Sequence, residues 1–529
     1  KYTTLDTPAD GFVVQNPATL TDRSPLSNPA ERVSPWKILE KENGSPDYFR
    51  FTTGFMPNDK ALCESTGIPL GVIINPFALM DSPLIEHSQS KLDRCTKCFG
   101  YLSPFAEVQN GSFICPLCKT KNQLIGNDIS VEMQTAVHDI HVGDPFTKSK
   151  PLIRPCICIA VDLTEHSLAT GYPQQFLASV KATLPSIPDE VKFTLVTFAD
   201  SISYFDFANQ REIVVMDLGD ITQLHNFSFT LGEYRPNIEV ALDYLINNPP
   251  NNTGSGNSFY QVVKFVSQIF KPTGALLVMQ MDRFIPVTLQ STEQRSKTSE
   301  GVGLLQQGSV SLSLFASTIT GESLTHPLSL SLSTHGEFVF LQEPSESEFK
   351  RLHLELFNVL TREYGWHASL RLRSTPGIKI GHPYGNFYQL SSGLVSFPVI
   401  NRDTSLAFPL TIEATLTSEP IFQCALLWTN NKMERIARIF TFKMPITNDI
   451  NQLTTSINEL ALSTFIGRYY AHVILTSNPN DAYTKAIKMY QAMSRYPTSS
   501  VGCLVHSLLE YPALKQRSNS DALFESARS

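Results

Sequence analysis

The sequence predicts a multidomain chain of class α/β plus β, with a four-cysteine zinc module and a helical region after the last strands. Two Cys-x-x-Cys pairs lie close together early in the chain. Further on, short apolar runs alternate with amphipathic stretches, which is typical of a parallel sheet covered by helices. Strand patterns also occur on both sides of these regions. A chain of 529 residues is long enough for several such domains.

Charge and hydropathy argue against two classes of protein. The chain carries 42 Lys and Arg against 49 Asp and Glu, a net charge of −7, whereas domains that bind nucleic acid are usually basic. We therefore expect no nucleic-acid partner. No apolar run approaches the ~18 residues that a membrane-spanning helix needs. The chain starts at Lys1 without an initiator Met or an apolar leader, so we expect a fragment of a longer protein.

The first part of the chain predicts β structure after a loosely ordered lead-in. Residues 1–45 are rich in Pro, Thr, Ser and Asn and show little periodicity. Residues 46–87 contain two short extended runs, at 48–53 and 70–74, which turn residues separate. We interpret residues 46–87 as the first part of a β domain.

The Cys-x-x-Cys pairs, within residues 88–128, predict a structural zinc site. The ligands are Cys95, Cys98, Cys115 and Cys118. Two facing pairs give the tetrahedral geometry that zinc prefers. Four protein ligands leave no open position for a substrate, so one structural Zn²⁺ is expected. The alternative, four free or disulfide-paired thiols, is disfavoured because the other cysteines are isolated among apolar residues, and the pairs then favour a reducing compartment.

Residues 150–390 predict the α/β domain. The expected strands are all short and either apolar or alternating: 156–161, 192–198, 202–207, 275–281 and 366–373. A helix is expected to begin at Pro173 and another to span 259–270. Ser345 and Glu348 form a capping-box pattern, which predicts a third helix directly after Ser345.

The last part of the chain predicts strands and then helices. Residues 391–448 contain alternating patterns, including two strands joined by the turn at 429–432. Residues 449–529 keep near-helical spacing of apolar and aromatic side chains. We interpret these aromatic stripes as core rather than as a ligand site.

The sequence contains no recognisable catalytic motif. There is no P-loop, no GxSxG elbow, no HExxH and no dinucleotide GxGxxG pattern. His138 and His141 lie three residues apart without an evident third ligand, so we expect a solvent-facing pair rather than a metal site. No catalytic residue is assigned, and the chain is not expected to be an enzyme.

One segment resembles a degenerate magnesium site. Asp162-Leu163-Thr164-Glu165-His166 follows the first apolar strand of the α/β domain. At this position von Willebrand A domains carry Asp-x-Ser-x-Ser, whose oxygens bind Mg²⁺. His166 takes the place of the last Ser, and imidazole is a poor ligand for a hard octahedral cation. We therefore expect a von Willebrand A-like domain that has lost its metal.

Several stretches resemble the cargo-adaptor subunit of the COPII inner coat, the Sec24 family. The likeness runs from about residue 45 to 515, in the domain order of that family. It is carried by the segments at 48–57, 68–77, 94–105, 272–278 and 425–438. The resemblance implies that the two β stretches join into one split β-barrel, into which the zinc module and a von Willebrand A-like trunk are inserted. It also implies that the helical region is truncated before the family's gelsolin-like domain, and residues 283–303 read unlike the family.

The resemblance further implies a coat subunit that binds rather than catalyses. Such a subunit pairs with the GTPase-activating coat subunit through the trunk and is recruited to membrane by a small GTPase. It captures sorting signals on the cytosolic tails of membrane cargo. It is cytoplasmic and peripheral, at endoplasmic reticulum exit sites and on COPII vesicles that travel to the Golgi. Which signals bind is not determined by the sequence.

Arg50 is the candidate cargo-binding residue, because it lies on the family's entry strand and because guanidinium groups grip acidic signals bidentately. Four arginines are weaker candidates that we expect to pair with surface carboxylates: Arg371, Arg373, Arg435 and Arg438. Three alternative functions stay open. They are the GTPase-activating sister subunit, a von Willebrand A-type interaction module or enzyme with Mg²⁺ at Asp162, and a zinc-ribbon nucleic-acid factor.

Overall fold

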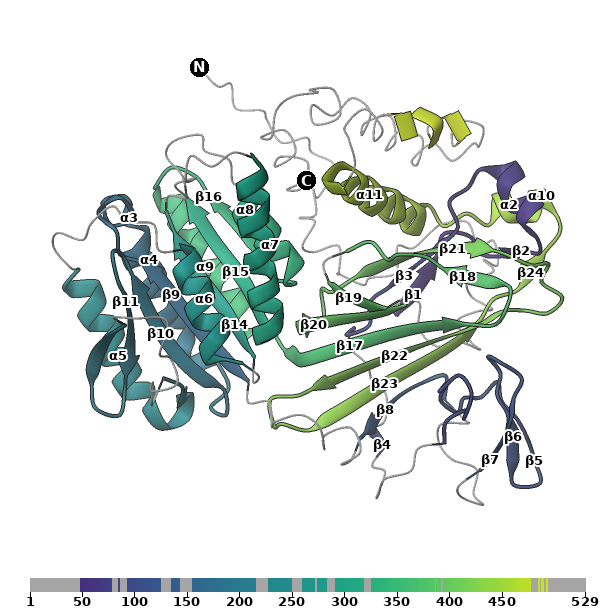
Figure 1. Ribbon diagram of the computed structural model, residues 1–529, viewed down its shortest axis with the longest axis horizontal. Coiled ribbons are helices and arrows are strands. Elements are labelled where there is room, and N and C mark those ends of the chain that lie inside the picture. The colour runs from purple at the N-terminus through teal and green to yellow at the C-terminus, as the bar shows by residue number, and fades with distance from the viewer. Residues whose placement is uncertain are drawn as a thin grey trace, which may run out of the picture.

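The computed structural model describes an α/β trunk and, beside it, a β-sandwich that carries the zinc module and a group of helices (Figure 1). The described residues are 48–78, 84–85, 93–124, 135–142, 155–215, 227–249, 259–271, 274–282, 291–317, 325–385, 387–391, 393–476, 484–485, 487–489 and 491–492. The predicted lead-in at 1–45 and the end of the helical region lie outside them. No helix in these ranges has both the length and the apolar character needed to span a bilayer.

The trunk, from β9 to α9, is built on an eight-stranded sheet. Its order is β12-β11-β10-β9-β14-β15-β16, with β13 paired to β10. Neighbours from β10 to β16 are parallel, whereas β11, β12 and β13 are antiparallel additions. The strands are β9 (Cys156–Asp162), β10 (Lys192–Phe198), β11 (Ile202–Asp206), β12 (Arg211–Val215), β13 (Phe229–Thr230), β14 (Ala275–Met281), β15 (Val310–Ser317) and β16 (Phe338–Leu341).

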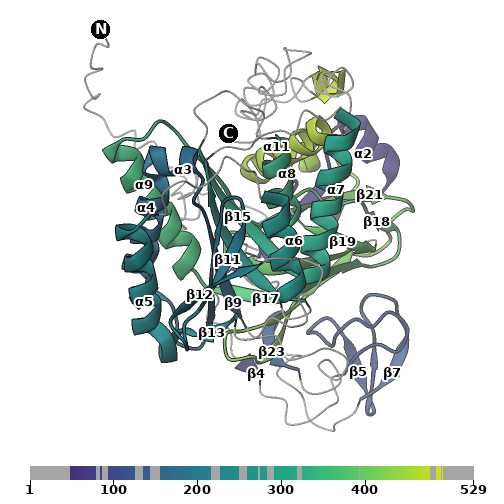
Figure 2. The same ribbon diagram turned by 60° about the vertical axis from the view of Figure 1, so that its left-hand side comes forward.

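Helices cover both faces of this sheet (Figure 2). One face packs against α3 (Glu165–Thr170), α4 (Tyr172–Thr183), the 3-10 helix η4 (Leu184–Ser186), α5 (Leu231–Asn247) and α9 (Glu346–Thr361). The other packs against α6 (Phe259–Ile269), α7 (Ser291–Gly308) and α8 (Thr325–Ser333). Because both faces are covered, every residue of β9 and of β14 is buried. The predicted parallel α/β fold is confirmed.

The start of α9 confirms the predicted N-cap. Ser345 Oγ accepts a hydrogen bond from the backbone N–H of Glu348 at 3.3 Å. The carboxylate of Glu348 does not complete a reciprocal capping box, because it accepts from the backbone N–H of Gln342 instead. The cap therefore ties the helix start to the segment that follows β16.

The β-sandwich joins segments from both ends of the chain. Its larger sheet has the order β19-β20-β17-β22-β23-β8-β4 and its smaller sheet the order β1-β3-β21-β18. The pairing of β3 with β21 brings residues 71–74 against residues 406–409. The strands are β1 (Phe49–Phe51), β3 (Gly71–Ile74), β4 (Leu84–Ile85), β8 (Val137–His141), β17 (Tyr364–Ser374), β18 (Ile378–Ile380), β19 (Tyr388–Ser391), β20 (Leu394–Asn401), β21 (Leu406–Ile412), β22 (Ile421–Thr429) and β23 (Arg435–Lys443). The expected joining of the two β stretches is confirmed, but they form two packed sheets rather than one closed barrel.

The assignment of the strand at 366–373 to the α/β domain is wrong. This strand is β17, which pairs antiparallel with β20 and β22 in the sandwich. Its first apolar residues, Tyr364 and Trp366, belong to the trunk core, whereas Leu370 and Leu372 belong to the sandwich core. The sandwich thus begins near residue 364 rather than 391. Alternation along the strand predicted its burial but could not show which sheet holds its partners.

Two small units complete the fold. The zinc module contains a three-stranded sheet of β5 (Glu107–Gln109), β6 (Ser112–Ile114) and β7 (Lys121–Gln123). On the opposite side of the sandwich, helix α11 (Glu459–Thr476) packs on the smaller sheet through Ala461 and Phe465. The remaining elements beside it are α2 (Lys60–Thr66), α10 (Ile450–Thr455) and the strand pair β2 (Met56–Pro57) with β24 (Ile446–Thr447).

Candidate metal centre and the basic cluster beside it

The two Cys-x-x-Cys segments fold into matching knuckles. In the first, the backbone N–H of Phe99 donates to the carbonyl of Cys95; in the second, that of Lys119 donates to the carbonyl of Cys115, both at 2.9 Å. Phe99 and Lys119 occupy the same place in each knuckle, and both have positive φ angles, 57° and 58°. Left-handed residues at this point close each knuckle tightly, so that both thiols of a pair face the same side.

The knuckles bring the four predicted ligands together. The Sγ atoms of Cys95 and Cys118 are 3.4 Å apart, and those of Cys98 and Cys115 are 3.6 Å apart. All four sulfurs lie within 4.8 Å of one another, and among the described residues this is the single group of three or more potential metal-binding side chains. With Zn–S bonds of about 2.3 Å, a tetrahedral site has S–S edges of about 3.8 Å. The cluster therefore fits a tetrathiolate zinc ion.

The cluster needs the charge of a cation to hold four thiolates. Burial raises the pKa of the thiols of Cys98 and Cys115. At Cys118 partial burial also raises the pKa, but hydrogen bonds with Thr120 and with neighbouring thiols outweigh it and bring the pKa to about 6. Binding of zinc must therefore displace protons from Cys98 and Cys115.

The zinc module is fastened to the larger sheet of the sandwich. The buried side chain of Gln423, in β22, accepts from the backbone N–H of Tyr101 at 2.7 Å and donates to its carbonyl at 3.0 Å. Ile421, in the same strand, packs into the apolar cluster that surrounds the cysteines. The position of the knuckles relative to the sheet is thus fixed by a two-point polar contact and by apolar packing.

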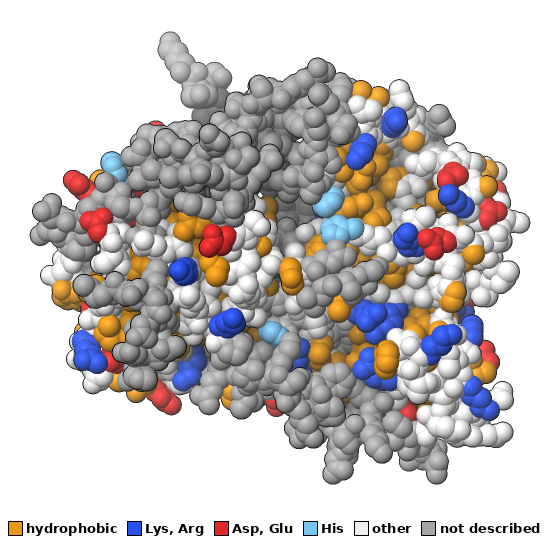
Figure 3. Space-filling view, in the orientation of Figure 1, with side chains coloured by type: hydrophobic (Ala, Val, Ile, Leu, Met, Phe, Trp, Pro, Cys, Tyr) orange, Lys and Arg blue, Asp and Glu red, His pale blue; other side chains and the backbone are white. Residues whose placement is uncertain are grey.

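A basic cluster of Arg94, Arg371 and Arg373 lies where the first knuckle meets the sheet. Arg94 donates to the carbonyl of Phe99 through Nε at 3.2 Å and Nη2 at 2.9 Å. Arg373 donates to the carbonyl of Cys98 at 3.2 Å. Lys and Arg side chains gather on the face of the sandwich shown in Figure 3, over β17 and β22 and beside the zinc module.

One guanidinium of this cluster is incompletely satisfied. Nη1 of Arg373 is buried and has no hydrogen-bond partner among the described residues. Burial, and then the neighbouring charges of Arg371 and Arg94, lower the pKa of Arg373. A buried donor without a partner is costly, and three like charges repel one another. An anion bound beside the cluster would relieve the repulsion between these charges.

Arg94 is not among the candidate residues that the sequence pattern indicates, and Arg373 is one of the weaker candidates. Position alone could have identified Arg94, since it directly precedes Cys95 and must lie at a knuckle. The role of Arg373 depends on its pairing opposite Gln423, the residue that anchors the zinc module. The contact of Gln423 with Tyr101 joins segments more than 300 positions apart in the chain, so the sequence near Arg373 carries no signal of it.

Arg50 lies on a different face. In β1 it pairs with Ile73 of β3, and paired residues of an antiparallel sheet share a face. Ile73 packs against Phe465 of α11, so the half-buried Arg50 is beside the helical region. Its role in cargo binding remains a prediction.

The other two arginines are not ordinary surface residues. Arg438 is 8% exposed and forms a bidentate ion pair with Asp139, at 2.7 and 2.8 Å. Arg435 donates to the carbonyl of His367 and to the hydroxyl of Thr429, and burial lowers its pKa to about 10. The expected carboxylate partner is present for Arg438, but both side chains are largely buried rather than at the surface. For Arg435 the expectation is wrong, because in the described part of the chain its guanidinium is bound by a carbonyl and a hydroxyl.

The interpretation of His138 and His141 as a solvent-facing pair is also wrong. His138 is 1% exposed, and both residues lie in β8. Residues three apart share a face of a helix but point to opposite faces of a strand. The two imidazoles therefore cannot act as one unit.

Asp162 lies at the end of β9, as expected from the magnesium-site pattern, but its oxygens already have protein partners. They accept from the backbone N–H groups of Thr164 at 2.9 Å and of Asp282 at 3.3 Å. Asp282 accepts in turn from Ser317 Oγ at 2.7 Å. His166 is exposed on α3. Loss of the metal remains a prediction that this arrangement supports.

Two family models match parts of the chain. Residues 93–126 match the Sec23/Sec24 zinc finger, and residues 365–447 match the Sec23/Sec24 beta-sandwich domain. The zinc-finger match and the cysteine cluster together establish one structural zinc site.

Similar proteins extend the likeness along most of the chain. Protein transport protein SEC24 of Komagataella pastoris is 24% identical over 502 residues, which cover 84% of this chain and 52% of that protein. Human Protein transport protein Sec24B is 25% identical over 529 residues, which cover 90% of this chain and 41% of that protein. The chain thus spans about half the length of the curated relatives it matches.

A solved structure confirms the fold. The crystal structure of the human COPII-coat protein Sec24c superposes with a TM-score of 0.81 and 17% sequence identity. The match covers 92% of this chain and 75% of that one. The trunk, the zinc module, the sandwich and the helices therefore share one known arrangement.

Proposed function

We propose that this chain, which belongs to the Sec24 family, is a COPII coat subunit that binds sorting signals of cargo proteins. The observation that carries the proposal is the structural likeness to a COPII-coat protein along 92% of the chain. The relatives reported above are named Sec24, so the GTPase-activating sister subunit is not favoured. The chain would pair with that subunit through the trunk. A small GTPase would recruit the pair to endoplasmic reticulum exit sites, for transport to the Golgi.

The proposed activity is binding without turnover. A sorting signal is a short flexible segment that loses conformational entropy when it docks, so each contact is expected to be weak. Many coat subunits on one vesicle compensate through avidity. Weak contacts of this kind need only a shallow surface with a few fixed charges. The basic cluster is such a surface.

We place the binding of acidic signals at the basic cluster. Arg371 is exposed and Arg94 is half-buried beside the charge of Arg373, and a carboxylate accepts from guanidinium groups with short charge-assisted bonds. Phe99, at the tip of the first knuckle, is 57% exposed and lies 5.8 Å from the guanidinium carbon of Arg94. A signal that places an apolar side chain beside its acidic residue would contact both.

Peptide titration tests this placement. An acidic tail peptide and a control peptide with Gln and Asn in place of Glu and Asp are titrated by calorimetry against the wild type, Arg94→Gln and Arg373→Gln. Each variant should weaken the acidic peptide about tenfold, since a charged hydrogen bond is worth ~1.5–3 kcal/mol. Lys379→Gln is the matched control, because Lys379 is 65% exposed in β18 of the other sheet.

Arg50→Ala is titrated in parallel, because Arg50 is the alternative candidate. Loss of affinity in Arg50→Ala alone would move the site to the face covered by α11. Equal affinity for the acidic and the control peptide would remove the acidic-signal assignment altogether.

We also propose that Cys95, Cys98, Cys115 and Cys118 are the four ligands of the structural zinc. The support is the geometry of their sulfurs. Zinc binding to such modules contributes ~10–16 kcal/mol of local folding free energy. In Cys115→Ser the zinc content should fall from one per chain towards zero, and residues 93–124 should become sensitive to protease. Cys63→Ser, a half-buried thiol outside the cluster, is the control and should keep its zinc. A stable Cys115→Ser protein with full zinc content contradicts the ligand assignment.

A further inference from the structure

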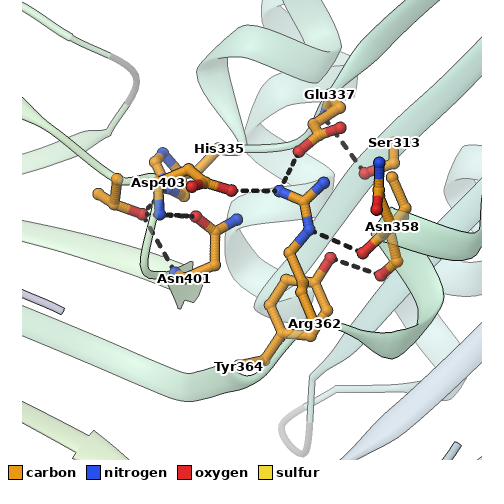
Figure 4. A network of polar contacts seen from close by, with 10 residues as sticks. Ser313, His335, Glu337, Asn358, Arg362, Tyr364, Asn401 and Asp403 are labelled. Atoms are coloured by element: carbon orange, nitrogen blue, oxygen red, sulfur yellow. Dashed lines mark hydrogen bonds and ion pairs between the residues drawn. The ribbon is translucent and has the colours of Figure 1, made fainter. Parts of the chain in front are cut away.

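Polar side chains join separate units of this fold in more than one place. One such place is the contact of the trunk with the sandwich. There Arg362, at the C-terminal end of α9, forms ion pairs with Glu337 of the trunk and with Asp403 of the sandwich (Figure 4). These two units also share apolar packing, since Val399 of β20 lies in the trunk core. Another such place is the zinc module, where the side chain of Asn122 contacts both knuckles.

The backbone of Asn122 is fixed relative to the second knuckle. That knuckle is the loop of the hairpin formed by β6 and β7, and Asn122 lies in β7 opposite Phe113 of β6. Phe113 is buried in the apolar cluster that contains Cys95 and Cys115. Asn122 is itself 5% exposed. A buried polar side chain at this position must find its partners within the module.

The side chain of Asn122 forms three hydrogen bonds that span the two knuckles. Its Oδ1 accepts from the backbone N–H of Thr96 at 2.8 Å and from the hydroxyl of Thr96 at 2.9 Å. Its Nδ2 donates to the carbonyl of Thr120 at 2.8 Å. Thr96 directly follows Cys95, whereas Thr120 lies two residues after Cys118. One buried amide thus connects the first knuckle to the end of the second.

The partners determine the orientation of this amide. A backbone N–H can only donate and a carbonyl can only accept, so Oδ1 faces Thr96 and Nδ2 faces Thr120. Ionised Asp at this position would place a second acceptor against the carbonyl of Thr120, and Leu would supply neither group. The hydroxyl of Thr120 lies 3.3 Å from Sγ of Cys118. The effect of Asn122 therefore reaches a predicted zinc ligand through one intervening residue.

The spacing of the knuckles matters for metal binding because the four sulfurs come from two separate segments. Four thiolates repel one another until the cation is bound. Ligands that already stand at the required spacing lose less conformational entropy when the metal binds. Polar partners around a set of metal ligands typically raise the affinity for the metal by ~10–100-fold.

We propose that Asn122 is the positioning residue of the zinc site. It sets the spacing between the two knuckles, raises the affinity for zinc and keeps the sulfurs close to a tetrahedral arrangement. The inference rests on the proposed assignment of the four cysteines as ligands. It goes beyond that assignment because it gives a specific role to a residue outside the ligand set.

Chelator competition on the whole chain tests the effect on affinity with Asn122→Leu. Leu has nearly the shape of Asn but forms none of the three hydrogen bonds, so the zinc affinity should fall ~10–100-fold. Thr96→Val is a milder variant, because it removes the hydroxyl partner and keeps the backbone N–H. It should lower the affinity about threefold, and it decides the outcome if Asn122→Leu does not fold.

Cobalt substitution separates positioning from general stability. Co²⁺ binds the same thiolates, and its visible absorption spectrum depends on the symmetry of the ligands around it. In Asn122→Leu the absorption bands should shift and lose intensity, because the knuckles no longer hold one spacing. A side chain that only stabilises the fold would leave the spectrum of the bound cobalt unchanged.

Matched control variants separate this effect from others. Gln123→Leu makes a similar change at the next position of β7, where the side chain is exposed. Asp403→Asn removes a polar contact between the trunk and the sandwich (Figure 4). Both variants should keep the zinc affinity within about twofold and retain the cobalt spectrum of the wild type.

The outcomes distinguish the inference from the ligand assignment. Wild-type affinity or an unchanged cobalt spectrum in Asn122→Leu overturns the role of Asn122. If that variant does not fold, wild-type affinity in Thr96→Val does so. An equal loss of affinity in Gln123→Leu or Asp403→Asn also overturns it, because the effect would then be general. Full zinc content in Cys115→Ser contradicts the ligand assignment instead.

Discussion

At the scale of single residues, this chain satisfies buried polar groups in two contrasting ways. The four thiols of the zinc module have few partners other than one another and require a cation. Asp162, by contrast, is 3% exposed and accepts two backbone N–H groups, and the neighbouring Asp282 accepts a hydroxyl. Backbone donors are fixed by the fold, so this carboxyl is held in place by the sheet edge itself.

The burial of Asp162 opposes ionisation of its carboxyl and therefore predicts a pH dependence of stability. Burial raises the pKa of Asp162 to about 6, against hydrogen bonds from Thr164 and Asp282 that lower it. The folded protein therefore binds this proton more tightly than the unfolded chain does. The resulting stabilisation is complete below the unfolded pKa, near 4, and is lost as the pH rises through 6. Between pH 5 and pH 7 the free energy of unfolding should fall by about 1 kcal/mol from this group.

Urea denaturation of the wild type and of Asp162→Asn at each pH measures this contribution. The asparagine variant should lose this part of the pH dependence, whatever its absolute stability. Identical pH profiles for both proteins would refute the assignment. Added Mg²⁺ should leave the wild-type midpoint unchanged at pH 7, and a clear stabilisation by Mg²⁺ would instead support a working metal site.

At the scale of elements, the sequence pattern predicted the features that depend on residues close together in the chain. The strands β9, β10 and β14 begin at the expected residues, because continuous apolar runs reflect burial on both faces. The four metal ligands follow from spacing alone. The sheet that receives β17 and the burial of Arg438 could not be predicted, because both depend on pairing between segments far apart in the chain. Arg373 belongs to the same class, since its importance comes from a carbonyl in the zinc module.

The start of α9 gives a prediction at this scale. Ser345 is the N-cap, and its hydroxyl oxygen satisfies the otherwise free N–H of Glu348. Ser345→Ala should lower the free energy of unfolding by about 1 kcal/mol, the usual cost of losing such a cap. Chemical denaturation measures the change. Ser347→Ala removes the exposed neighbour whose hydroxyl lies 3.0 Å from that of Ser345 but keeps the acceptor of the cap, so it should change stability by less than half as much. Equal effects would show that Ser345 contributes as an ordinary surface serine.

At the scale of the whole molecule, Arg373, one of the residues proposed to bind cargo, joins the zinc module to the sandwich beside the Gln423 contact. The carbonyls of Cys98 and Phe99, within the first knuckle, accept from Arg373 and Arg94. The knuckle is thus both a product of zinc binding and the support that orients the guanidinium groups. The trunk, where the coat partner is proposed to bind, shares no hydrogen bond with the knuckle among those described above. Zinc should therefore control one proposed function and spare the other.

Removal of zinc tests this coupling. The chain is treated with a strong chelator, its zinc content is measured, and acidic-peptide affinity and trunk-partner binding are determined on the same sample. Loss of the metal releases the knuckle carbonyls, so peptide affinity should fall at least about tenfold, whereas partner binding should stay within about twofold. Restoring one equivalent of zinc should restore the peptide affinity. Because protons compete with zinc for the thiolates, the chelator should also act faster and more completely as the pH falls. If peptide affinity survives complete removal of zinc, the arginines are oriented by the sheet alone, and the basic cluster does not depend on the metal.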